Sequence, residues 1–121
     1  MVSRHEVLAR LDAGDPAGAA RIAGEILAAR PENADVQGLL ALALDEAGHK
    51  EEALDAMRLA VALPAAPSIA LRNTTNLAAM LVGAGLKDEA AGLLRSAWPW
   101  LPDIEIGNNE RQCITLLADI M

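Results

Sequence analysis

The sequence has no phenylalanine and no tyrosine, and its two tryptophans bring the aromatic share to only 2%. Hydrophobic residues nevertheless make up 53% of the 121 residues, and alanine supplies much of that share. Strands favour β-branched and aromatic side chains, whereas alanine is the best helix former and lets helices approach closely. The composition therefore predicts an all-α protein with thin helix–helix interfaces.

Basic residues, cysteines and long apolar runs are also scarce. Ten basic against 17 acidic residues leave a net charge of −7, and no dense cationic stripe predicts nucleic-acid binding. The single cysteine, Cys113, cannot form an internal disulfide, so we expect a reducing, cytoplasmic location. The first residues lack the apolar region of a signal peptide. The uncharged runs 59–71 and 73–86 are shorter than the ~20 apolar residues of a membrane-spanning helix, so we expect no membrane partner.

What the chain does contain is a repeated set of landmarks. Three glycines stand 34 and then 37 residues apart, each is followed five residues later by an alanine, and each is followed after another eleven or twelve residues by a proline. The sets are Gly14, Ala19 and Pro31; Gly48, Ala53 and Pro64; and Gly85, Ala90 and Pro102. We expect the three extra residues of the second interval in the loop between Pro64 and Pro67.

Each landmark has a physical role in a helical hairpin. Glycine closes a helix because it adopts a left-handed backbone without steric penalty. Alanine suits the closest helix crossing, and proline cannot continue a helix. Between the landmarks the apolar residues keep helical spacing. The predicted helices are 3–13, 16–30, 34–47, 50–62, 68–84, 87–98 and 108–120.

The clearest pattern lies in residues 34–66, with Leu40, Ala41, Leu44, Gly48, Ala53, Met57 and Ala60. At these positions the chain resembles the tetratricopeptide repeat family, whose unit is a helical hairpin of 34 residues. The third repeat follows the same pattern, the first fits if one residue is missing before Gly14, and the family's aromatic positions hold leucine, methionine or alanine. The resemblance covers residues 3–102. It implies one all-α domain, 1–121, with repeats at about 1–33, 34–66 and 67–104 in an α–α superhelix, closed by the helix at 108–120.

The resemblance also implies a concave groove, lined by the first helix of each hairpin, that binds a peptide or an amphipathic helix of another protein. Leu42 would offer an apolar contact, and Arg72 with Asn76 could grip a carboxylate or the backbone of a bound strand. Small residues would leave space on the groove floor. The alternative is that these are ordinary solvated helix positions. The full set of groove positions is His5, Ala9, Asp12, Asp35, Gly38, Leu39, Leu42, Asp45, Arg72, Thr75, Asn76 and Ala79.

Nothing in the residues predicts catalysis, a metal site or a cofactor. His5 and His49 lie on different hairpins, and residues 83–87 lack the strand and the spacing of a phosphate loop. Cys113 suits a packed small residue better than a nucleophile. Trp98 and Trp100 either seal the core or anchor a partner.

Three functions remain open at this point. The first is a protein-interaction module, in which residues 103–121 form a capping helix. The second is the substrate-recruiting part of a larger bacterial enzyme such as a protein glycosyltransferase, in which these residues begin another repeat. The third is a self-associating scaffold, for instance a homodimer.

Overall fold

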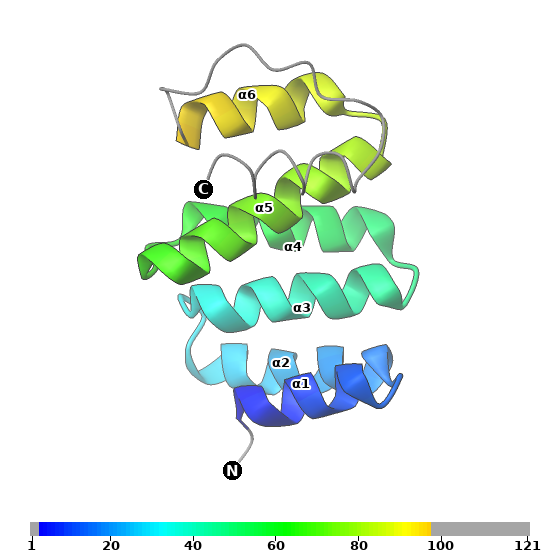
Figure 1. Cartoon of the computed structure of the whole chain (residues 1–121). Coiled ribbons are helices and arrows are strands. Elements are labelled where there is room, and N and C mark those ends of the chain that lie inside the picture. The colour runs from blue at the N-terminus through cyan, green and yellow to red at the C-terminus, as the bar shows by residue number, and fades with distance from the viewer. Residues whose placement is uncertain (1–2, 98–121) are drawn as a thin grey trace. The chain divides into compact units, whose positions relative to one another are not determined.

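The computed structural model describes residues 3–97, and every regular element in this range is an α-helix (Figure 1). The first six predicted helices are confirmed, with each boundary correct to within one residue. The predicted seventh helix, Pro102, Cys113 and both tryptophans lie outside the described residues. The helices are α1 (Arg4–Asp12), α2 (Pro16–Ala29), α3 (Ala34–Glu46), α4 (Lys50–Ala62), α5 (Pro67–Gly83) and α6 (Lys87–Ala97).

The chain divides into two compact units, with the division inside α5 between Asn73 and Thr74. The first unit contains α1 to α4 and the beginning of α5. From α1 to α4 the consecutive helices pack against one another and run antiparallel, and α1 also contacts α3 (Figure 1). The second unit contains the rest of α5 and α6.

The three landmark glycines end the first helix of each hairpin in the same way. Gly14, Gly48 and Gly85 have φ of 76°, 91° and 81°, the left-handed region that favours glycine. A Cβ added at any of them would meet no atom within 4 Å, so glycine is needed for its backbone conformation and not for space. Each turn is closed by a hydrogen bond from the residue after the glycine to a carbonyl five residues earlier, which is the Schellman pattern. These bonds are Asp15 to Arg10, His49 to Leu44 and Leu86 to Leu81.

The second helices of the first two hairpins end without a glycine. Arg30 and Leu63 leave the helical conformation, with ψ of 78° and 142°, and each immediately precedes a proline. A proline ring clashes with a helical backbone at the residue before it, which explains both endings. Each ending opens a link of the same length, 30–33 and 63–66.

The longer second interval has a different origin from the one predicted. The two links are equally long, so the prediction that the loop between Pro64 and Pro67 holds the extra residues is wrong. Instead α5 has 17 residues where α3 has 13. Pro67 begins α5, a position where its missing N–H and fixed φ are tolerated. The added residues therefore form an extra helical turn at the start of α5.

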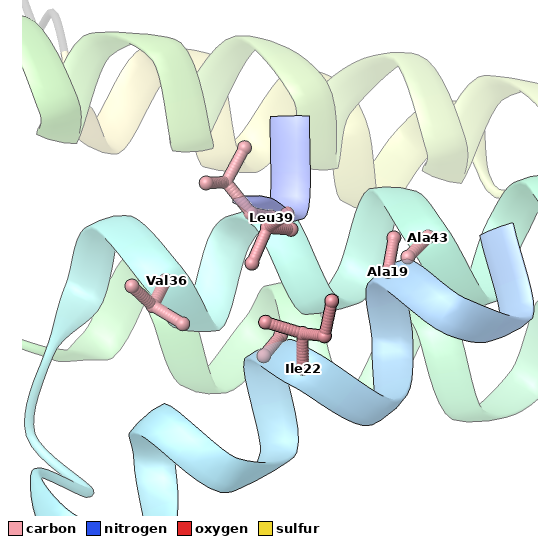
Figure 2. Packing of buried hydrophobic residues seen from close by; sticks show 7 residues of the cluster. Ala19, Ile22, Val36, Leu39 and Ala43 are labelled. Carbon is pink, nitrogen blue, oxygen red and sulfur yellow. The ribbon is translucent and has the colours of Figure 1, made fainter. Parts of the chain in front are cut away.

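The core is thin, as the alanine content predicts. Ala19, Ala53 and Ala90, the three landmark alanines, are all 0% exposed. In the first unit Ala19 packs among leucine, isoleucine and valine side chains of α1, α2 and α3. Figure 2 shows Ala19 and Ile22 on α2 beside residues of α3. A larger side chain at such a crossing would force the helices apart.

Candidate functional site

Asp35, in the first turn of α3, joins three helices of the first unit. Its Oδ2 accepts a hydrogen bond of 2.6 Å from Nε of Arg4 on α1. Its Oδ1 accepts one of 2.6 Å from Nη1 of Arg72 on α5, and Nη2 of Arg72 donates to the backbone carbonyl of Asp35 at 2.9 Å. The first helices of three successive hairpins therefore meet at one carboxylate. We call Arg4, Asp35 and Arg72 the arginine–aspartate cluster.

The charges of this cluster determine the ionisation of Asp35. Burial raises the pKa of its carboxyl group, but the hydrogen bonds and charges of Arg4 and Arg72 lower it more, so the pKa of Asp35 lies below its ordinary value. The position in the first turn of α3 also favours a negative charge. Two guanidinium groups against one carboxylate leave one net positive charge here, in a chain whose overall charge is −7.

Asn73 stands beside the cluster and fills the space next to Gly38. Its side chain is fully buried, its Nδ2 donates to the carbonyl of Ala34 at 3.1 Å, and its Oδ1 accepts from Nη2 of Arg72 at 3.0 Å. A Cβ at position 38 would overlap the Asn73 amide and come within 2.8 Å of Nη2 of Arg72. Glycine at this point of α3 is therefore what allows the beginning of α5 to approach. The open floor that we expected beside Gly38 is occupied by the protein itself.

The predicted groove residues differ in how accessible they are. His5, Ala9 and Asp12 are exposed on α1. Gly38 and Leu39 on α3 and Ala79 on α5 are buried, which leaves little of them for a partner to contact. The others are partly exposed: Asp35, Leu42, Asp45, Arg72, Thr75 and Asn76.

The structure brings only some of these residues together. Asp35, Gly38 and Arg72 meet around the cluster, while Leu42 lies farther along α3 and packs partly against the core of the first unit. Asp45 makes an ion pair of 2.8 Å with Lys50. Thr75, Asn76 and Ala79 belong to the second unit. Arg72, which we expect to grip a partner together with Asn76, contacts Asp35 and Asn73 within the protein.

Arg4 and Asn73 are the residues that the sequence reasoning missed. A signal for the cluster was present, because Asp35 and Arg72 hold the same position in neighbouring repeats and carry opposite charges. Equivalent positions of stacked hairpins lie next to each other, so a salt bridge between them could have been predicted. Asn73 gave no such signal, because the sequence does not show which groups a buried amide will bond.

A model of the tetratricopeptide repeat matches residues 10–70, half of the chain. The chain belongs to the tetratricopeptide repeat family. The match begins in the last turn of α1 and ends in the first turn of α5, so it covers α2, α3 and α4 in full. Repeats of this family generally mediate contacts between proteins and are typically not catalytic. Neither the comparison with curated proteins nor the comparison with solved structures found a match.

The described part of the repeat domain lacks two kinds of feature. Within residues 3–97, no helix is long and apolar enough to cross a membrane. In the same range, no three histidine, cysteine, aspartate or glutamate side chains are grouped so that they could hold a metal ion.

Proposed function

We propose that this chain is a protein-interaction module that binds a peptide or a helix of a partner on the surface formed by the first helices of its hairpins. We call this surface the first-helix face and define it, within the first unit, by His5, Asp35, Leu42, Asp45 and Arg72. The observation that carries the proposal is the arginine–aspartate cluster. It brings together Arg4 of α1, Asp35 of α3 and Arg72 of α5, which supports a shared surface on the first helices of the hairpins.

The chemistry of the first-helix face suits a partner with both apolar and charged groups. Leu42 is partly exposed and offers an apolar contact. The side chains of Arg4 and Arg72 are 43% and 30% exposed, and the arginine–aspartate cluster carries one net positive charge. A partner carboxylate near them would be attracted by charge and hydrogen bonding. Because Arg72 already bonds Asp35, the partner would have to share this guanidinium or displace that carboxylate.

A photo-crosslinking experiment tests which surface is used. A photoreactive amino acid replaces His5 on the first-helix face and, in a matched control, Glu25 on the exposed side of α2. Both sites are solvent-exposed, so the probe should disturb the fold in neither case. We expect covalent capture of a partner from the His5 site and not from the Glu25 site. Capture from Glu25 alone would place the interface on the second helices and contradict the proposal.

The captured partner then allows a quantitative test. Binding of its crosslinked segment is measured by titration calorimetry against His5→Glu and Leu42→Ala, with Arg21→Ala on α2 as the control. Arg21 is exposed and forms only a surface ion pair with Glu25 at 3.6 Å. We expect both face variants to weaken binding and the control to leave it unchanged, with circular dichroism confirming the fold. Unchanged binding in both face variants would move the interface elsewhere.

A further inference from the structure

The end of α4, the link after it and the extra turn of α5 form an exposed surface without charge. Residues 59–71 contain no charged side chain, and their one hydrophilic side chain is Ser68. Leu59 is 49% exposed, and Leu63 and Ile69 are partly exposed. The remaining exposed residues of this stretch are Ala62, Pro64, Ala65, Ala66, Pro67, Ser68 and Ala70. We call residues 59–70 the α4–α5 corner; it lies wholly within the first unit.

The preceding hairpin shows that the fold does not require an apolar surface at this place. Its link contains Arg30, Glu32 and Asn33, all polar, where the α4–α5 link contains leucine, proline and alanine. Six residues after the landmark alanine, α2 carries the exposed Glu25 and α4 carries Leu59. The same structural positions therefore hold charged side chains in the first hairpin and uncharged side chains in the second.

The extra helical turn of α5 lies at the same corner. Its residues 67–70 are exposed except for Ile69, so the turn adds little to the core. It extends the uncharged surface beyond the link. The extra turn and the uncharged surface thus occur at the same place in the repeat. Exposed apolar surface of this kind marks contacts between proteins.

We propose that the α4–α5 corner is a contact surface between two copies of this chain. Two molecules of charge −7 repel each other, and the repulsion is weakest where the contact surface carries no acidic group. An uncharged apolar patch is also complementary to itself, as a contact across a two-fold axis requires. A stable interface uses about 20–30 residues on each side, and the corner supplies roughly half of that number, so the dimer is weak and depends on concentration.

Sedimentation velocity of the 121-residue chain over a range of concentrations tests this proposal. We expect a monomer–dimer equilibrium that becomes stronger as salt is added, because salt screens the repulsion between the two acidic molecules. Leu59→Glu gives α4 the residue that α2 already has at the same position, and Ala66→Glu adds a charge within the link. Each should weaken association by at least about tenfold, since a carboxylate would lose water in the contact. Ala28→Glu adds the same charge to an exposed position of α2 and should change nothing beyond the added repulsion.

The proposal requires that a dimer is observed, that both corner variants weaken it, and that added salt does not dissociate it. A monomer at every concentration would overturn the proposal. So would a dimer that survives both corner variants, a dimer that Ala28→Glu weakens as much as they do, or a dimer that salt dissociates. Circular dichroism of each variant shows whether the helices are intact. The proposal does not use the first-helix face, so its failure would leave partner binding there unaffected.

Discussion

Replacing Gly38 by alanine should destabilise this protein, although the same change at Gly24 should stabilise it. Both glycines lie inside helices, where alanine is favoured over glycine by about 1 kcal/mol. Gly24 is exposed and a Cβ there would meet no atom within 4 Å, so the gain should appear in full. Comparing Gly24→Ala with Gly38→Ala therefore measures the effect of the same substitution at a site with free space and at a site with a close neighbour.

At Gly38 the added methyl group would collide with the amide of Asn73. That side chain is 0% exposed and is held at both ends, by the Ala34 carbonyl and by Arg72, so it cannot move without losing partners. An unsatisfied buried polar group costs about 1–3 kcal/mol, and both the Oδ1 and the Nδ2 of Asn73 would lose a hydrogen bond. The propensity gain of about 1 kcal/mol is subtracted from these two costs, so we expect Gly38→Ala to lower the free energy of unfolding by on the order of 1–5 kcal/mol.

Urea unfolding followed by circular dichroism measures both variants against the unmodified chain. Two further variants, Asn73→Ala and the double variant Gly38→Ala/Asn73→Ala, test the cause. In the Asn73→Ala background Gly38→Ala should cost much less stability, because the amide is gone and only the flexible end of Arg72 remains close to the added methyl group. The two effects are then strongly non-additive, as expected for residues in contact. If Gly38→Ala raised stability as Gly24→Ala does, the close approach of α5 to α3 would be wrong.

Two further predictions concern the core and the arginine–aspartate cluster. Ala53→Leu should lower the free energy of unfolding by about 1–3 kcal/mol because Ala53 is 0% exposed at a helix crossing, whereas Ala62→Leu on the exposed side of α4 should have little effect in the same urea titration. Since the folded-state pKa of Asp35 is lowered, its contribution to stability is present above the unfolded-state pKa of about 4 and is lost as the pH falls below it. The stability difference between the unmodified chain and Asp35→Asn should therefore be constant near neutral pH and shrink in acid, and a difference that grew in acid would contradict the cluster.

The repeat could be predicted well because its signals are local. A left-handed turn needs glycine, a close crossing needs a small side chain, and a proline forces the residue before it out of the helix. Each requirement acts within a few residues of chain, so Gly48, Ala53 and Pro64 could be interpreted without knowing what packs against them. The six helix boundaries followed from the same signals.

The candidate site could be predicted only in part. Asp35 and Arg72 were predicted to line a groove from their repeat positions, and the structure adds that they bind each other. Gly38 was expected to leave open space, yet Asn73 fills it. Whether a polar side chain is free or engaged depends on residues more than thirty positions away in the sequence, and helical periodicity carries no such information.

The sequence by itself determined that this chain forms helical hairpins, where the six helices of residues 3–97 begin and end, and which alanines are buried between them. It did so because these features depend on backbone conformation and on the spacing of apolar residues along one helix. Only the tertiary structure decided that the longer interval is an extra turn of α5, that Arg4 joins Asp35, and that the uncharged stretch after α4 is exposed. These features depend on the contacts that each helix makes with others, and those contacts exist only in the folded chain.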